Sequence, residues 1–153
     1  LIAEASGETI GALRDVSPEL LTQYRDALPA DIHRRCRHVV TEIDRTREAV
    51  ADLRAGDVAA FGTLMNASHD SLRDDYEVSG PELDALVTIA REVDGVYGAR
   101  LTGAGFGGCA VALARADAVD ELVQAVAAEY PSQSGLEAEV YVCRAVAGAG
   151  RVG

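Results

Sequence analysis

The chain has 153 residues, of which 48% are hydrophobic, so its length and composition are those of one compact globular domain. Its formal net charge of -11 argues against binding to nucleic acid or to an anionic membrane through bulk electrostatics. No apolar run reaches the roughly eighteen residues that span a bilayer, and the first residues lack the basic region of a secretion signal, so we expect a soluble cytoplasmic protein.

Two helices are expected in the first third of the chain. Ser17, Pro18 and Glu19 supply a cap, a first-turn proline and an early acidic residue, and together they predict a short helix. From Asp31, apolar residues recur at three- and four-residue steps, which predicts a long amphipathic helix that ends at Gly56. The expected inward face of this long helix consists of Ile32, Cys36, Val39, Val40, Ile43, Val50 and Leu53.

Two further helices follow. Asp57 is expected to cap a third helix that runs to the polar residues around Asp74. Its inward residues are Val58, Phe61, Leu64, Met65 and Leu72. Ser79 and Glu82 have the spacing of a capping box, in which each side chain accepts a hydrogen bond from an unpaired backbone amide at the start of a helix. The apolar stripe of this fourth helix is Leu83, Leu86, Val87 and Ala90.

The next elements are expected to be two strands and a helix. Strands are predicted at 96–102 and 109–114, on either side of a glycine-rich loop. Asp117 is expected to cap a helix that Gly135 closes. The apolar residues of that helix are Val119, Leu122, Val123, Val126 and Tyr130.

Two more strands complete the expected sheet. Residues 137–143 alternate in part and end in β-branched and aromatic residues, which favours a strand, and a weaker pattern favours another at 9–13. Several helices followed by β-loop-β, helix and β indicate an α+β fold, with helices packed on one face of a mainly antiparallel sheet. Residues 148–153 are expected to form a flexible tail.

The three cysteines are Cys36, Cys109 and Cys143. Their odd number and wide spacing support neither a disulfide framework nor a CxxC metal site. We therefore expect free thiols, most of them buried.

The most informative motif is the loop Gly103, Ala104, Gly105, Phe106, Gly107 and Gly108. It satisfies G-x-G-x-x-G, but a dinucleotide fingerprint requires a helix directly after the loop, and here a strand is expected. A Walker loop is excluded because no Lys-Ser or Lys-Thr pair follows the glycines. Two interpretations remain: a loop whose glycines permit positive φ and close approach of another surface, or a tight connection whose glycines only relieve backbone strain.

Some groups of residues contain the residue types of a catalytic triad or a metal site but lack the spacing that such a site requires. Ser68, His69 and Asp70 are adjacent on one helix, where their side chains point in different directions, so they are not a hydrolytic triad. His33 and His38 are five residues apart, which does not align them on one helix face to bind a metal. We expect no metal site and no catalytic residue among them.

The clusters of charged residues are interpreted as structural features of the surface rather than as binding sites. The basic residues Arg34, Arg35, Arg37, Arg45 and Arg47 are expected to form a solvated helix face. Their expected partners are Glu42, Asp44 and Glu48 on the same helix. Asp74 and Asp75 are interpreted as surface or capping carboxylates rather than as a magnesium site.

The sequence LTGAGFGG resembles the third signature of the GHMP small-molecule kinases. The stretches 12–16, 37–42, 64–87, 96–113 and 139–145 extend this resemblance, and they are similar to the galactokinase branch of the family. The similarity runs from about Gly11 to near the end of the chain and concerns the C-terminal portion of those enzymes. Ile43 and Gly80 depart from the pattern of that branch.

The resemblance implies a GHMP kinase C-terminal domain over residues 1–147, with a ferredoxin-like arrangement and extra helices. It implies that ATP and Mg²⁺ are bound mainly by an N-terminal half, which also supplies the catalytic residues and the galactose site and is the partner of this chain. Gly103–Gly108 would then lie beside the nucleotide phosphates. The alternatives are a stand-alone α+β binding or association module, and a GHMP kinase acting on a different small alcohol.

Overall fold

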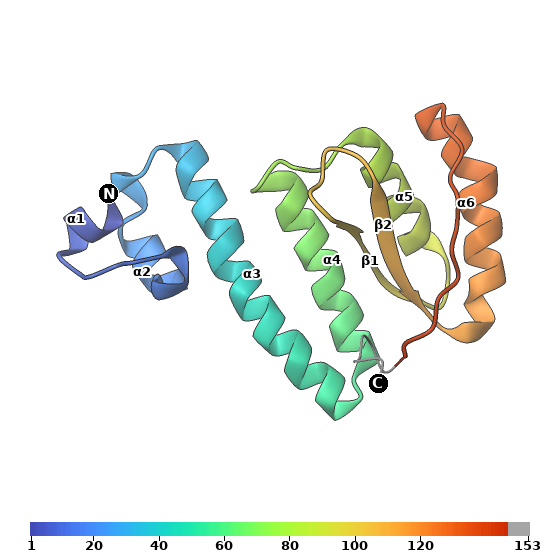
Figure 1. Ribbon diagram of the computed structural model, residues 1–153, viewed down its shortest axis with the longest axis horizontal. Helices are drawn as coiled ribbons and strands as arrows, with labels where there is room; N and C mark the ends of the chain where they lie inside the picture. The colour runs from blue at the N-terminus through green and yellow to red at the C-terminus, as the bar shows by residue number, and fades with distance from the viewer. Residues whose placement is uncertain (147–153) are drawn as a thin grey trace, which may run out of the picture.

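The computed structural model describes residues 1–146, which fold into helices around a two-stranded sheet (Figure 1). The α-helices are α1 (Ile2–Ser6), α2 (Pro18–Gln23), α3 (Ala30–Ala55), α4 (Val58–Asp74), α5 (Pro81–Glu92) and α6 (Val119–Ser134). The strands are β1 (Val96–Thr102) and β2 (Cys109–Ala114), and short 3-10 turns are η1 (Leu13–Asp15), η2 (Arg25–Ala27) and η3 (Ala116–Ala118). Within residues 1–146, each helix is too short or too polar to cross a lipid bilayer. The tail predicted at 148–153 lies outside the described residues.

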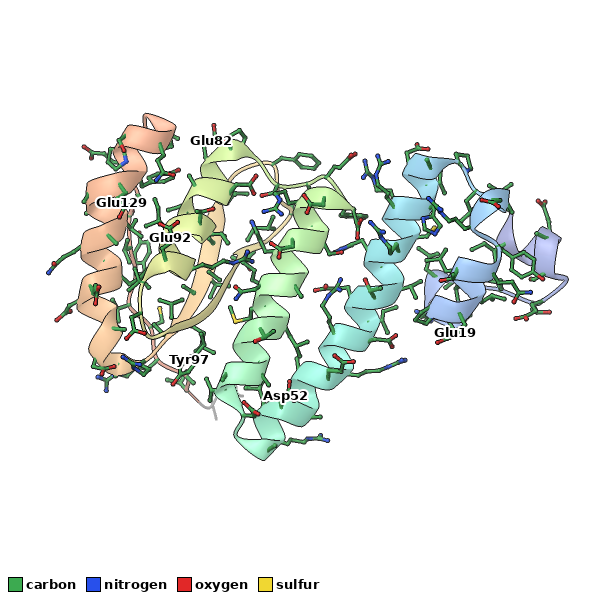
Figure 2. All side chains as sticks on the ribbon, turned by 180° about the vertical axis from the view of Figure 1, so that it is seen from behind. Glu19, Asp52, Glu82, Glu92, Tyr97 and Glu129 are labelled. Atoms are coloured by element: carbon green, nitrogen blue, oxygen red, sulfur yellow. The ribbon has the colours of Figure 1, made fainter. Side chains whose placement is uncertain are left out.

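The elements succeed one another across the molecule in nearly the order of the chain (Figure 1). The N-terminal helices α1 and α2 pack on one side of α3, and α4 lies on its other side. The sheet follows, with α5 packed against it and α6 packed on α5. Figure 2 shows acidic side chains on four different helices, among them the exposed Glu19, Glu82 and Glu129, so the negative charge is spread over the surface.

Four of the expected helix ends are confirmed. The Ser17 hydroxyl accepts the Leu20 amide at 3.2 Å, and the Asp57 carboxylate accepts the Ala60 amide at 2.9 Å. Gly56 and Gly135 end α3 and α6 with φ values of 75° and 73°, in the left-handed region that glycine enters without strain. These local signals were therefore sufficient to place the start of α2, the turn between α3 and α4, and the end of α6.

Two expected caps are wrong because the side chains bind other partners. The N-cap of α5 is Gly80, and the Ser79 hydroxyl donates instead to the Asp84 carboxylate at 2.6 Å. Asp117 accepts from the Arg115 guanidinium at 3.1 Å and lies in η3, before α6 begins. Both bonds involve a charged group and are stronger than a bond to a neutral amide, so neither the Ser79 hydroxyl nor the Asp117 carboxylate serves as the expected cap.

The strands β1 and β2 have the predicted bounds and pair antiparallel, with Leu101 opposite Ala110. Ala99 and Leu101 of β1 are fully buried against α5. Two buried clusters form this layer: Leu72, Val78, Leu83 and Leu101, and beside them Val87, Ala90 and Ala99. The expected α+β fold, with helices packed on an antiparallel sheet, is confirmed.

Side chains of α4 cover the edge of β1 that faces away from β2. The Ala99 amide donates to Asn66 Oδ1 at 2.9 Å, and the Leu101 amide donates to His69 Nδ1 at 3.2 Å. Arg91 of α5 donates to the Ala99 carbonyl at 3.2 Å. Side chains of two helices thus supply the hydrogen bonds that a third strand would supply at this edge.

The strands predicted at 9–13 and 137–143 are wrong. At the first, the amides of Gly11 and Ala12 donate to Asp15 Oδ2 at 3.0 and 2.8 Å, which forms a local turn. At the second, the chain runs back beside α6 without strand pairing (Figure 1), and Ala138 packs against the cluster that contains Tyr130. A strand exists only where a neighbour satisfies its backbone, and neither segment has such a neighbour within residues 1–146.

The expected inward face of α3 is confirmed only in its middle. Val40 is buried in a cluster with Ile2, Val16 and Leu21, and Cys36 packs on that cluster. Ile43 is more than half buried. At the two ends, Ile32, Val50 and Leu53 are 42%, 44% and 53% exposed, because this long helix extends past the elements that cover its centre.

The expectation of mostly buried thiols is wrong. Cys36 is partly buried, whereas Cys109 and Cys143 are exposed. All three are free, as expected.

Candidate functional site at the glycine loop

The loop from Gly103 to Gly108 connects β1 to β2 and has a left-handed backbone along most of its length. The φ values are 86° at Gly103, 82° at Gly105, 123° at Gly107 and 104° at Gly108. Phe106, which has a side chain, also has a positive φ of 60°. Glycine adopts these conformations without a steric penalty, so the expectation of positive φ is confirmed.

The centre of the loop is held against the connection between α4 and α5. The Phe106 amide donates to the Val78 carbonyl at 2.6 Å. A β-carbon on Gly105 would lie 2.3 Å from the same carbonyl oxygen, a distance that no side chain can occupy. The close approach expected of this loop is therefore to the protein's own backbone at Gly105.

The rest of the loop is open. A β-carbon placed on Gly103, Gly107 or Gly108 would have no neighbouring atom within 4 Å, and the Phe106 side chain is 79% exposed. Glycine backbone in consecutive left-handed conformations can present amide groups to an anion, because no side chain blocks the approach. The loop can thus contact a phosphate group through its backbone while Val78 fixes its centre.

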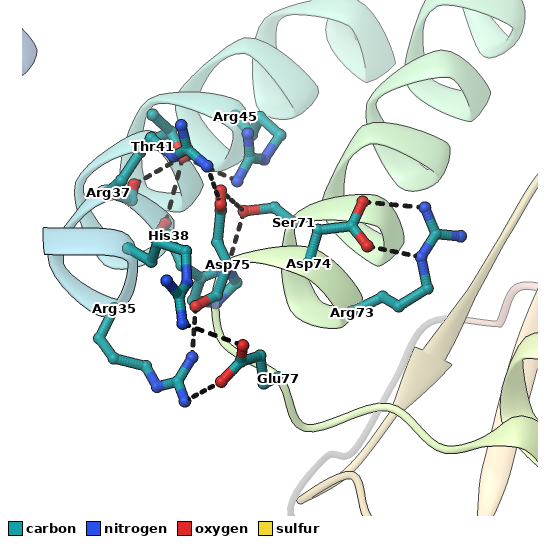
Figure 3. A network of polar contacts seen from close by, with 11 residues as sticks. Arg35, Arg37, His38, Thr41, Arg45, Ser71, Arg73, Asp74, Asp75 and Glu77 are labelled. Carbon is teal, nitrogen blue, oxygen red and sulfur yellow. Dashed lines mark hydrogen bonds and ion pairs between the residues drawn. The ribbon is translucent and has the colours of Figure 1, made fainter. Parts of the chain in front are cut away.

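Arginines of α3 bind the connection that carries Val78 (Figure 3). Arg35 Nη1 donates to the Asp75 carbonyl at 2.6 Å, and its Nη2 pairs with the Glu77 carboxylate. Arg34 Nη2 lies 3.0 Å from Glu77 Oε1, and Arg37 pairs with the Asp75 carboxylate. Three arginines therefore join α3 to Asp75 and Glu77, two of the three residues between α4 and Val78.

The expected pairing of these arginines is partly wrong. Arg45 pairs with Glu42 at 2.8 Å and Arg47 with Asp44 at 2.9 Å, as expected for one helix face. Arg34, Arg35 and Arg37 instead reach carboxylates some forty residues away. The sequence showed basic and acidic residues but not which elements would lie side by side.

A buried polar group beneath this connection was missed by the sequence analysis. His38 Nδ1 lies 3.0 Å from Ser71 Oγ, which donates to Asp75 Oδ2 at 3.2 Å (Figure 3). The His38 ring also stacks on the Tyr76 ring, with the ring centroids 4.6 Å apart. Because the serine proton is directed to Asp75, His38 is the donor to Ser71 and does not activate it as a nucleophile. Burial lowers the pKa of His38. Its role is to join α3 to the end of α4.

Ser68, His69 and Asp70 bind three different partners, as expected of neighbours on a helix. Ser68 donates to Glu42 at 2.6 Å, His69 accepts the Leu101 amide, and Asp70 pairs with Arg91 at 2.9 Å. They do not form a triad.

The carboxylates considered for metal binding are paired with arginines. Asp74 accepts two bonds from Arg73, whose hydrogen bond lowers the pKa of Asp74, and Asp75 pairs with Arg37. Residues 1–146 contain no group of three or more His, Cys, Asp or Glu side chains placed to hold a metal ion.

Comparison with known proteins identifies the family. Residues 49–132 match the family model described as GHMP kinases C terminal. The chain belongs to the GHMP kinases. As a GHMP kinase, it is 51% identical over 143 residues to a galactokinase from Roseiflexus sp. (strain RS-1), a match that covers 94% of this chain and 37% of that protein.

Two solved structures share the GHMP kinase fold with this chain. Lactococcus lactis galactokinase complexed with galactose is 42% identical with a TM-score of 0.83, over 88% of this chain and 35% of that one. L. major mevalonate kinase in complex with R-mevalonate is 30% identical with a TM-score of 0.59, over 82% of this chain and 37% of that one. This GHMP kinase chain spans about a third of the length of these relatives, and the resemblance expected from LTGAGFGG is confirmed.

Proposed function

We propose that this chain is the C-terminal part of a cytoplasmic galactokinase, which transfers the γ-phosphoryl group of ATP to the anomeric hydroxyl of galactose. The observation that carries the proposal is the fit to the galactose-bound enzyme of Lactococcus lactis, with a TM-score of 0.83. The match to mevalonate kinase is weaker in both fold and identity, at 0.59 and 30%. Galactose is therefore the favoured acceptor among the small alcohols of the family.

The glycine loop is the part of this chain that we assign to the active site. Phosphoryl transfer depends on holding the phosphates in line with the acceptor and on stabilising the charge that spreads over their oxygens. The left-handed backbone of Gly103, Gly107 and Gly108 is open to such a group, and Val78 fixes the loop between them. We therefore place Gly103–Gly108 against the nucleotide phosphates, as one wall of the site.

The remaining chemistry belongs to the N-terminal half of the protein. Asp74 and Asp75 are paired with Arg73 and Arg37, so they do not fit a Mg²⁺ site, and no step is assigned to a metal held by this chain. We assign Mg²⁺, most of the ATP contacts, the catalytic carboxylate and the sugar site to that half. The chain alone then lacks most of the charge stabilisation that the reaction requires.

The test is formation of sugar phosphate by the full-length protein with ATP and, in parallel, galactose, homoserine and mevalonate. We expect galactose 1-phosphate to be the main product. A higher kcat/KM for either of the other two alcohols would overturn the choice of galactose.

A second measurement concerns the chain alone. The purified chain of residues 1–153 should form no more galactose 1-phosphate than a blank without protein. This should hold at both limiting and excess ATP. Turnover by this chain alone would contradict the assignment of chemistry to the N-terminal half.

A further inference from the structure

The connection between α4 and α5 is a short, well-anchored segment. The amides of Asp75 and Tyr76 donate to the Ser71 carbonyl at 3.0 Å, and the Val78 amide donates to the Leu72 carbonyl at 3.0 Å. The Val78 side chain is buried with Leu72. The segment therefore stays close to the end of α4 on one side and reaches the glycine loop on the other.

Glu77 is the unusual residue of this segment. Its φ is 55°, in the left-handed region that residues with side chains rarely adopt. Its carboxylate is held by Arg34 and Arg35, and Arg35 also binds the carbonyl of Asp75. The Arg35 guanidinium thus bridges the Asp75 carbonyl and the Glu77 carboxylate, and these two contacts fix the turn.

The turn is coupled to the glycine loop by one atom. The Val78 carbonyl oxygen accepts a hydrogen bond from the Phe106 amide, and it lies 2.3 Å from the position that a β-carbon on Gly105 would occupy. Phe106 is the other residue with a side chain and a positive φ within residues 1–146. Two residues with unfavourable backbone conformations, Glu77 and Phe106, therefore lie on either side of one hydrogen bond.

We propose that Arg35 and Glu77 are positioning residues for phosphoryl transfer, which hold the Gly103–Gly108 loop in place through Val78. This inference rests on the proposed function of the loop. Neither residue is required to touch ATP or galactose. Because both side chains are partly exposed, at 35% and 47%, their ion pair contributes little to global stability, and its effect should be on the loop.

The test uses the full-length protein with Arg35→Gln and Glu77→Gln as single variants. Arg47→Gln is the matched control, because Arg47 lies on the same helix and pairs with Asp44 away from the turn. Each single variant should raise the KM for ATP or lower kcat by about tenfold, since displacing a group by less than an ångström is costly in such reactions. The KM for the acceptor alcohol and the thermal midpoint should change little.

A readout independent of turnover is hydrogen exchange of the Phe106 amide, the loop amide that donates to the Val78 carbonyl. It should be about tenfold faster in Glu77→Gln than in the parent, and unchanged in Arg47→Gln. Unchanged exchange at the loop, or faster exchange with unchanged kinetics, would overturn the positioning role. The kinetics are measured with whichever alcohol the protein phosphorylates, so failure of the galactose assignment would be visible separately, as activity on another acceptor with the exchange result intact.

Discussion

Gly62 of α4 and Gly98 of β1 lie in direct backbone contact. A β-carbon on Gly98 would be 2.1 Å from the Gly62 carbonyl oxygen, and one on Gly62 would be 2.3 Å from the carbonyl oxygen of Tyr97. This contact brings α4 close enough for its side chains to bind the backbone of β1.

Gly98→Ala should therefore destabilise the protein by about 3 kcal/mol, because the clash is with backbone atoms that cannot move without parting the helix from the strand. Gly11→Ala is the control: its β-carbon would meet nothing nearer than Asp15 Oδ2 at 3.4 Å, and a change under about 0.5 kcal/mol is expected. Urea unfolding measures both. Equal stability of the two variants would show that the helix can move away without loss.

Gly105→Val and Gly107→Val should each impair the full-length enzyme, for different reasons. At Gly105 a side chain would collide with Val78, whereas at Gly107 the space is open and only the φ of 123° opposes a side chain. We expect kcat to fall or the KM for ATP to rise by about tenfold in both, with the larger loss of thermal stability at Gly105. Unchanged kinetics in both variants would show that the loop is only a connection.

His69 should make stability fall as the solution is acidified. Burial lowers the pKa of His69, and the charges of Arg91 and Arg73 lower it further, against the opposing charges of Asp84 and Asp70. An unfolded histidine has a pKa of about 6.5, so the unfolded state takes up the proton first as the pH falls, and the free energy of unfolding decreases from there down to the folded pKa. Protonation at Nδ1 would also remove the acceptor of the Leu101 amide.

The measurement is urea unfolding of the parent and of His69→Gln at about pH 7.5 and 5.5. Glutamine does not titrate, so the variant should lose less stability between the two values. An NMR titration of His69 in the parent is the second measurement, and a pKa at or above the ordinary value would contradict the expectation.

Ile43→Asn should cost about 2 kcal/mol, through lost apolar burial and a poorly paired amide. The Ile43 side chain, in the middle of α3, is less exposed than that of Ile32 on the same helix, which is 42% exposed. Ile32→Asn is therefore the control, with an expected change of about 0.5 kcal/mol. Similar thermal midpoints for Ile43→Asn and the parent would refute the burial argument.

The parts of the fold that the sequence predicted depend on neighbours in the chain. The hairpin of β1 and β2 was placed to the residue, because its two strands and their glycine loop are contiguous. The ends at Gly56 and Gly135 follow from the conformation of single residues. The protein family could also be predicted from the glycine loop, because all residues of its motif are adjacent in the sequence.

The parts that the sequence did not predict depend on which elements meet. Residues 137–143 have strand-forming side chains, yet pairing requires an edge that the segment does not reach. Arg35 reaches Glu77 across 42 positions, and His38 reaches Ser71 across 33. No periodicity encodes such contacts, so the support of the glycine loop could be found only in three dimensions.

Because the side chains of Asn66 and His69 accept backbone amides of β1, they limit the edge at which a further strand can join the sheet. With the amides of Ala99 and Leu101 already bound, the β1 edge offers no row of free donors to another chain, which is the usual starting point of edge-to-edge aggregation. A strand that widens this sheet must therefore pair with β2. Loss of either acceptor side chain would weaken the packing of α4 on β1. It would also leave a backbone amide of β1 unpaired at this edge, where a strand of another chain could bind it.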